Sequence, residues 1–202
     1  NWIPFGGGAE SLTALASLGA ASVTKIRIHG AYHRGQVLKA GDGFVILDFE
    51  GEPGRPLAER RAKHCALKDV AGMFRSFAYA AESGLAAATM ETPEARGLAD
   101  RLAPWAERWE QRVQTAFLEG YLAETWQRGA RFLPADRDRL DAVLRAFALD
   151  KTVYELQYEL DHRPTWVRIP LEGLRRAGTV TPRPAPASLR LVGPDARDAL
   201  AD

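Results

Sequence analysis

Apolar residues recur at steps of three and four along most of the chain, which is the spacing of one face of an α-helix. The pattern predicts helices over residues 11–18, 57–63, 68–83, 93–128, 136–149, 150–161 and 166–176. Pro104 lies inside the longest segment, where a proline costs about 3 kcal/mol, so we expect a kink or a fresh start there. Almost no turn signal separates residues 136–149 from 150–161, which indicates one bent helix ending before Pro164.

The same periodicity predicts which side chains form the core. In each long segment we expect one stripe to face inward. The predicted stripes are Leu67, Val70, Phe74, Phe77 and Ala81, then Leu98, Leu102, Trp105, Trp109 and Val113, continued by Leu118, Tyr121, Leu122 and Trp126, and finally Leu140, Val143, Leu144 and Phe147.

One short region has the pattern of strands instead. Residues 37–39 and 44–47 are apolar runs, and Gly41-Asp42-Gly43 between them has the composition of a tight turn. We therefore predict a β-hairpin, entered through an extended segment at residues 23–28. The fold class that follows is mainly α-helical with one small β-hairpin.

Polar residues gather at both ends of the predicted hairpin. His29-Gly30-Ala31-Tyr32-His33-Arg34-Gly35-Gln36 precedes it, and Asp48-Phe49-Glu50 follows it. The amide of Gln36 and the carboxylate of Asp48 offer the oxygen ligands that Mg²⁺ prefers. A carboxylate closing an apolar run is costly to bury without a cation. Phosphoryl transfer needs this kind of positioning and charge stabilisation.

The spacing matches the protein-kinase catalytic loop, in which an amide metal ligand follows the Asp base by five residues. Gln36 follows position 31 by five, but position 31 is Ala31. A methyl group accepts no proton, and a general base contributes about 10²–10⁴-fold, so we expect this chain itself to be inactive. His29 and His33 flank the position. Both are candidate catalytic-loop residues, expected to orient the loop and Asp48 instead of titrating.

These residues resemble the C-terminal lobe of bacterial maltokinases, including those fused to trehalose synthase, within the aminoglycoside-phosphotransferase-like kinases. That family reads H-G-D-x-H-x-G-Q at the loop and D-F-E-G-E-P after the hairpin. The resemblance covers roughly residues 10 to 178. It is carried by His29–Gln36 and Asp48–Pro53, and it continues through Arg55-Pro56-Leu57, Lys68–Met73, Asp150-Lys151 and Tyr154-Glu155.

The resemblance implies a protein-kinase-like C-terminal lobe at residues 10–178. Composition indicates a flexible lead-in at 1–9 and a Pro-rich linker or tail at 179–202. No nucleotide-binding N-lobe precedes the loop in this sequence, so we expect the chain to be a fragment of a longer protein. The implied reaction is transfer of phosphate from ATP, with Mg²⁺, to maltose, which gives maltose 1-phosphate on the route from trehalose to α-glucan. A fused or associated trehalose synthase is an implied partner, and Asp69 would brace the catalytic region.

A candidate sugar site lies near one helix end, because sugars bind through aromatic faces and carboxylates. Its residues are Asp150, Tyr154, Glu155, Tyr158 and Trp166. A core-facing tyrosine stripe with a capping Asp explains them equally well. Two further residues each have two possible roles. Glu50 is either a second Mg²⁺ ligand or a partner for Lys or Arg. Arg55 is either a phosphate contact or an ion-paired surface residue.

Composition narrows the class of protein. The chain has 202 residues and a net charge of +1, which is not the charge of a nucleic-acid-binding surface. No apolar run approaches the ~20 residues of a membrane span, and the first residues lack signal-peptide features. A single cysteine, Cys65, permits no internal disulfide and fits the cytoplasm. Two alternatives remain open: a non-catalytic pseudokinase or binding module, and a different small-molecule kinase that acts on glucosamine or aminoglycosides.

Overall fold

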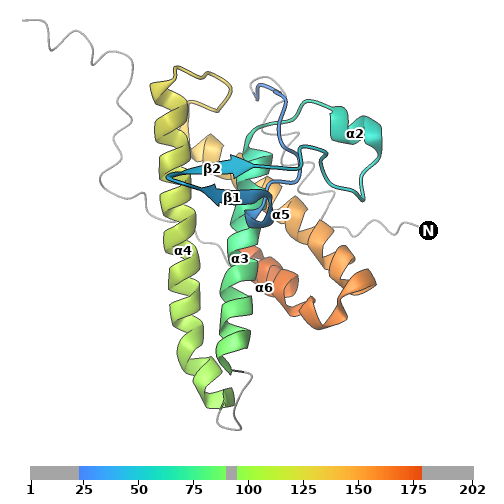
Figure 1. Ribbon diagram of the computed structural model, residues 1–202, viewed down its shortest axis with the longest axis vertical. Coiled ribbons are helices and arrows are strands. Elements are labelled where there is room, and N and C mark those ends of the chain that lie inside the picture. Colours follow the sequence, from blue (N-terminus) through green and yellow to red (C-terminus); the bar gives the residue numbers. More distant parts are fainter. Residues whose placement is uncertain (1–22, 90–94, 179–202) are drawn as a thin grey trace, which may run out of the picture.

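The computed structural model describes residues 23–89 and 95–178. Long helices pack side by side, and a two-stranded antiparallel hairpin lies against them (Figure 1). This confirms the predicted fold class. The expected helix at residues 11–18 and the end segments 1–9 and 179–202 lie outside the described residues.

The helix α3 is central, since both α4 and α5 pack along it and α6 packs on α5 (Figure 1). The elements in chain order are η1 (Arg34–Gln36), β1 (Val37–Ala40), β2 (Gly43–Ile46), α2 (Leu57–Arg61), α3 (Leu67–Thr89), α4 (Ala95–Gln127), α5 (Arg137–His162), η2 (Pro164–Trp166) and α6 (Arg168–Gly178).

The hairpin forms where the sequence predicts it. Val37 pairs with Ile46 and Ala40 with Gly43, which leaves Gly41 and Asp42 as the turn. Gly41 has a φ of +55°, the left-handed conformation that glycine adopts without strain at the first position of a type II′ turn. The entry segment is extended, and Ile26 pairs with His64 just before α3. The loop at residues 29–36 thus lies between two paired segments, the Ile26–His64 bridge and the hairpin.

The helix α5 is continuous, as the missing turn signal indicates. Asp136 begins it, and its side chain accepts a hydrogen bond from the backbone N–H of Arg139 at 2.8 Å. The helix α4 runs unbroken through Pro104, so the fresh start considered there is wrong and the single long helix is confirmed, while a kink stays a prediction. Pro104 lies on the exposed side, so the carbonyl that loses its intrahelical partner, at position 100, faces solvent and can be hydrated.

The core lies between α3, α4 and α5. The buried set includes much of the predicted stripes. These residues are Leu67, Val70, Leu118, Leu122, Leu140, Val143 and Leu144, joined by Ala71 and Cys65, which the stripes did not include. Burial raises the pKa of the Cys65 thiol, so it remains protonated and unreactive.

The first half of α4 departs from the prediction. Trp105 is 67% exposed, Trp109 44% and Leu98 37%. Trp109 and Leu118 are nine residues apart, which is about 2.5 turns of an α-helix, so the two side chains point in opposite directions. The predicted stripe therefore combines residues that lie on opposite faces of one helix. Only the stripe containing Leu118 and Leu122 packs into the core.

Within residues 23–89 and 95–178, no helix combines the length and the apolar composition that crossing a lipid bilayer requires.

Candidate functional site

The loop before the hairpin is fastened to the first turn of α3 by Asp69. Its carboxylate accepts hydrogen bonds from the backbone N–H groups of His29 at 2.7 Å and Gly30 at 2.9 Å. Burial raises the pKa of Asp69, although both hydrogen bonds favour the ionised form. Both carboxylate oxygens therefore hold the loop, which is the bracing role that the resemblance implies for Asp69.

The loop also approaches α3 closely at Gly72. A Cβ atom at this position would lie 2.7 Å from the carbonyl oxygen of Tyr32. No side chain fits there without displacing the loop backbone. Glycine at position 72 therefore sets how closely the loop can approach the helix.

His29 joins the loop to the end of the hairpin. Its Nε2 lies 2.7 Å from the carbonyl oxygen of Leu47, and the backbone N–H of Ala31 points to its Nδ1 at 3.4 Å. The tautomer with the proton on Nε2 satisfies both contacts. The ring is buried and packs on Phe49, with ring centroids 4.7 Å apart. These contacts give His29 a positioning role, next to the residue that precedes Asp48.

Gln36 and Asp48 converge, as the metal-site hypothesis requires. The Gln36 side-chain N–H donates to Oδ2 of Asp48 at 2.6 Å, and the backbone N–H of Leu47 donates to the Gln36 carbonyl at 2.9 Å. Asp48 has a φ of +62°, a left-handed conformation that is uncommon outside glycine and that recurs at functional sites. The contact is solvent-exposed, so both side chains are accessible to a ligand.

The chemistry of this pair fits Mg²⁺ bound together with a nucleotide. Mg²⁺ is commonly held by one or two protein side chains, with phosphate oxygens and waters completing its shell. Among the described residues, no cluster of three or more His, Cys, Asp or Glu side chains is arranged to hold a metal on its own. A half-turn of the Gln36 amide would present its oxygen beside the Asp48 carboxylate.

Glu50 does not lie on an extended continuation of β2. The chain turns at Phe49 and Glu50, directly after the left-handed Asp48. The argument that Glu50 faces the same side as Asp48 in an extended strand therefore does not hold. The backbone carbonyl of Glu50 accepts from Arg60 at 3.4 Å. A metal role for its carboxylate stays a prediction.

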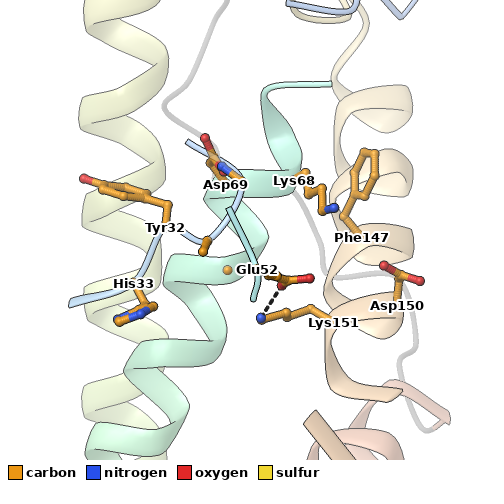
Figure 2. A pocket seen from close by; sticks show the side chains of 11 residues that line it. Tyr32, His33, Glu52, Lys68, Asp69, Phe147, Asp150 and Lys151 are labelled. Carbon is orange, nitrogen blue, oxygen red and sulfur yellow. Dashed lines mark hydrogen bonds and ion pairs between the residues drawn. The ribbon is translucent and has the colours of Figure 1, made fainter. Parts of the chain in front are cut away.

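A pocket opens between the loop, α3 and α5 (Figure 2). Tyr32 and His33 lie on its loop side, and Asp150 and Lys151 project from α5 on the other side, as Figure 2 shows. Ala31 is part of the wall, so position 31 faces the pocket. The lining residues are Gly30, Ala31, Tyr32, His33, Glu52, Lys68, Asp69, Gly72, Phe147, Asp150 and Lys151.

The charges in this pocket are largely paired. Glu52 is buried and forms ion pairs with Lys151 and, at 3.1 Å, with Arg55. Burial works to raise the pKa of Glu52, but the charge of Lys151 and the hydrogen bonds outweigh it and the pKa is lowered. Arg55 also contacts Glu59 at 3.0 Å and Asp150 at 3.8 Å, so it is an ion-paired residue.

His33 is held as a neutral acceptor. Its Nδ1 accepts a hydrogen bond from the backbone N–H of Gly35 at 3.1 Å, and this contact begins η1. Burial lowers the pKa of His33, and the charge of Lys151 acts in the same direction. At neutral pH the ring therefore orients the backbone that leads to Gln36 and carries no charge.

The residues predicted for the sugar site do not gather around one cavity. Of the five, only Asp150 lines the pocket. Glu155 lies in a buried ion pair with Arg75 at 2.7 Å, and Tyr154 lies against Lys151, whose Nζ is 4.6 Å from the ring centroid. Two further stacks involve Tyr158 with His162 and Trp166 with Tyr79.

Three residues that line the pocket were not predicted from the sequence: Glu52, Lys68 and Lys151. Two weak signals were present: Glu52 belongs to the Asp48–Pro53 motif, and Lys151 follows Asp150 in another matched segment. Neither signal indicates that the two side chains, which are 99 residues apart in the chain, form one ion pair. That contact depends on how α5 packs beside the loop.

Comparison with known proteins shows which enzymes this chain is related to. No protein-family model matches the chain. The chain is 35% identical over 159 residues to a glucosamine kinase of Mycolicibacterium smegmatis. The aligned region covers 76% of this chain and 35% of that protein. It is 30% identical over 145 residues to a glucosamine kinase of Streptacidiphilus jiangxiensis. That aligned region covers 72% of this chain and 30% of that protein. The chain is homologous to the C-terminal portion of glucosamine kinases.

Solved structures of glucosamine kinases share the fold of this chain. A glucosamine kinase crystal structure superposes with a TM-score of 0.65 at 26% identity, covering 84% of this chain and 36% of that one. A glucosamine kinase in complex with glucosamine, ADP and inorganic phosphate shares the fold, with a TM-score of 0.63 at 24% identity, covering 84% and 45%. The chain thus spans about a third of the length of the glucosamine kinases that it matches. The resemblance to small-molecule kinases is confirmed, and the narrower maltokinase identity stays a prediction.

Proposed function

We propose that this chain is the C-terminal lobe of an ATP-dependent small-molecule kinase whose acceptor is an amino sugar of the glucosamine type. The observation that carries the proposal is the contact between Gln36 and Asp48 across the end of the hairpin. It brings together the two oxygen-bearing side chains that a Mg²⁺–nucleotide site needs, on a loop held by Asp69 and His29. Residues 10–178 would form this lobe, with residues 179–202 as a linker or tail.

Each residue then has a defined task. Gln36 and Asp48 would hold Mg²⁺, which neutralises charge on the transferring phosphate when it is bound. Asp69 and His29 fix the loop and the end of β2, so that the two ligands stay in register. Position 31 would lie beside the acceptor hydroxyl, since it faces the pocket. Ala31 lacks the group that would take the hydroxyl proton.

Replacing Asp48 with asparagine tests the nucleotide site. The change keeps the shape of the side chain but removes its charge, so we expect binding of Mg²⁺·ATP to weaken by roughly tenfold or more. Isothermal titration of the full-length protein measures this directly and does not require turnover. Asp42→Asn in the hairpin turn is the matched control and should leave binding unchanged. Equal affinity in both variants would remove Asp48 from the metal site.

The choice of acceptor depends on the carboxylate in the pocket that has the weakest contacts. Asp69 holds two backbone N–H groups, and Glu52 pairs with Lys151 and Arg55. The Asp150 side chain is 44% exposed and contacts only Arg55 among the described residues, at 3.8 Å. It is therefore the pocket carboxylate with capacity for an incoming ammonium group. That property favours an amino sugar over maltose, which the motif resemblance implied.

Replacing Asp150 with asparagine should raise the KM for glucosamine by about tenfold, since a hydrogen bond to a charged group contributes about 1.5–3 kcal/mol. The KM for ATP should stay the same. The assay needs the full-length protein with a base restored at position 31, and Asp161→Asn near the end of the same helix is the control. If maltose is the better acceptor and Asp150→Asn does not affect it, the amino-sugar proposal fails while the kinase proposal stands.

A second function is favoured by one specific residue. Ala31 removes the proton acceptor, so a non-catalytic module that binds nucleotide or sugar fits the same geometry. Such a module would bind Mg²⁺·ATP through Gln36 and Asp48 and transfer no phosphate. A trehalose synthase partner, as the motif resemblance implies, would belong to this function. Determining the residue at position 31 in the native gene separates the two, because aspartate there restores the enzyme.

A further inference from the structure

Lys68 is a charged residue of the pocket that the proposed function does not use. It lies in the first turn of α3 and lines the pocket together with Phe147 and Asp150 of α5. Figure 2 shows its side chain extending from α3 toward Phe147. Among the described residues, no carboxylate oxygen lies within 4.0 Å of its Nζ, and its side chain has no hydrogen-bond partner there.

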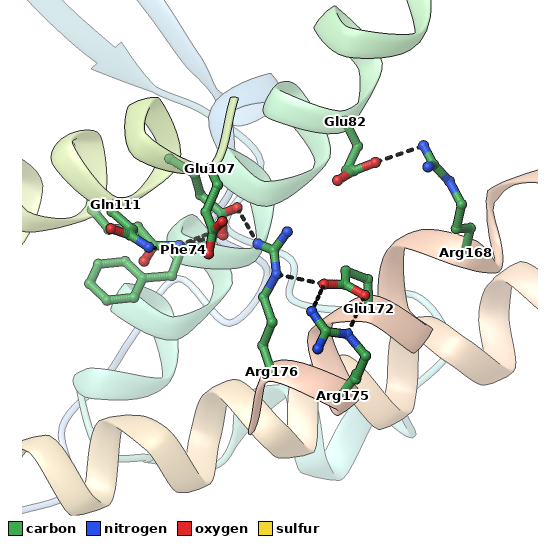
Figure 3. Close-up of polar contacts among 10 residues, drawn as sticks. Phe74, Glu82, Glu107, Gln111, Arg168, Glu172, Arg175 and Arg176 are labelled. Carbon is green, nitrogen blue, oxygen red and sulfur yellow. Dashed lines mark hydrogen bonds and ion pairs between the residues drawn. The ribbon is translucent and has the colours of Figure 1, made fainter. Parts of the chain in front are cut away.

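Cations that join the helices elsewhere in the bundle do have direct carboxylate partners. Arg168 of α6 pairs with Glu82 of α3 at 2.7 Å, as Figure 3 shows. Arg176 of α6 pairs with Glu110 of α4 at 3.0 Å. Lys68 forms no such link within the described part of the chain. Its position in the pocket therefore has no evident structural purpose, and its charge acts on whatever enters the pocket.

Two carboxylates that share the pocket with Lys68 are already engaged. One oxygen of Glu52 pairs with Lys151 and the other with Arg55, and both oxygens of Asp69 accept backbone N–H groups. Burial favours the neutral form of both carboxyl groups, and the charge of Lys68 acts against burial by lowering the pKa of each. The charge of Lys68 is thus felt inside the pocket, although neither carboxylate neutralises it by direct contact.

This arrangement treats one positive charge on an acceptor differently from two. An acceptor with a single ammonium group can place it at Asp150, the pocket carboxylate with the weakest contacts. A second ammonium group meets carboxylates that already have partners, and Lys68 repels it. Two like charges interact more strongly in a partly enclosed pocket than in bulk water, because the effective dielectric constant is lower. Placing a like charge in the site is a general means of excluding a wrong ligand.

We propose that Lys68 is a specificity-determining residue that restricts the acceptor to sugars with a single positive charge. The inference rests on the proposed function, since it takes this pocket as the acceptor site. The Lys68 ammonium group is a donor of three hydrogen bonds, so neutral hydroxyl groups are accepted where a second ammonium group is not. Aminoglycosides, which carry several ammonium groups, would be excluded for this reason.

The test compares the binding of two sugars by isothermal titration of the full-length protein, which requires no turnover. Glucosamine carries one ammonium group, and 2,6-diamino-2,6-dideoxyglucose carries two. Lys68→Gln removes the charge and keeps an N–H donor, Lys68→Arg keeps the charge, and Lys63→Gln is an exposed control outside the pocket. We expect Lys68→Gln to shift the affinity ratio toward the diamino sugar by about fivefold or more. Lys68→Arg and Lys63→Gln should keep the native ratio.

Salt provides a second measurement that does not depend on a variant that folds. High ionic strength should weaken the preference of the native protein for glucosamine, because salt screens the repulsion by Lys68. An unchanged ratio in Lys68→Gln, or equal shifts in the Gln and Arg variants, would overturn the role of Lys68 and leave the amino-sugar proposal intact. A native protein that binds neither sugar would overturn both, while the binding of Mg²⁺·ATP would still test the kinase site separately.

Discussion

Replacing Ala31 with aspartate is expected to raise phosphate transfer from ATP to the sugar acceptor by at least tenfold in the full-length protein. The surroundings of position 31 retain the parts that a base needs. The loop is held by Asp69 and His29, Gln36 and Asp48 meet, and Ala31 faces the pocket. A general base contributes about 10²–10⁴-fold to turnover. A steady-state ADP-release assay measures the change.

Ala31→Asn is the matched control, because asparagine has the size and polarity of aspartate but accepts no proton at neutral pH. It should leave turnover near the level of the alanine protein, while both variants bind Mg²⁺·ATP with similar affinity. A rise in turnover that is equal for Asn and Asp would show that polarity, not basicity, is limiting. No rise in either variant would contradict the assignment of position 31 as the base position.

Local spacing was sufficient to predict the part of the site that lies close together in the sequence. Gln36 and Asp48 flank a four-residue-per-strand hairpin whose tight turn leaves only one register, so strand pairing itself brings them together. The apolar runs and the glycine turn were visible in the sequence, and the convergence of amide and carboxylate follows from them. The same holds for α5, whose capping Asp136 and terminating Pro164 are local signals.

Long-range packing decided what the sequence did not reveal. The spacing of Trp105 and Trp109 is as regular as that of the buried stripe, and periodicity alone does not say which of two opposite faces meets α3. In the pocket, Glu52 can be recognised as a site residue only from the packing of α5, which brings Lys151 beside it. Tyr154 and Tyr158 lie on one helical face as predicted, but different neighbours surround each ring. Such contacts depend on tertiary structure, not on local pattern.

The second large effect is expected at the buried ion pair between Arg75 of α3 and Glu155 of α5. Both side chains are about nine-tenths buried, and Nε of Arg75 donates to Oε2 of Glu155 at 2.7 Å. Arg75→Met leaves Glu155 without its cation, so we expect the free energy of unfolding to fall by about 3–5 kcal/mol. Chemical denaturation followed by circular dichroism measures the loss.

The stability that Arg75→Met loses should also depend on pH, with a larger loss at higher pH. Burial already raises the pKa of Glu155 above its ordinary value of 4.5, and Arg75 is the largest influence acting against this. Without Arg75 the pKa rises further, so the folded state binds a proton that the unfolded state releases. The variant is then least destabilised below pH 4.5, and its stability falls as the pH rises through the folded-state pKa. A deficit that does not change with pH would mean that the Glu155 charge is not its cause.

A double variant separates the structural role of Glu155 from the sugar-binding role that its position in the sequence indicated. Arg75→Met combined with Glu155→Gln removes both charges of the pair, so most of the stability lost in Arg75→Met should return. If the pair acts only as a link between α3 and α5, the KM for the sugar in a protein with aspartate at position 31 should stay near its original value. If Glu155 also contacts the sugar, the KM should rise although stability is restored, because folding and acceptor binding would then depend on the same carboxylate.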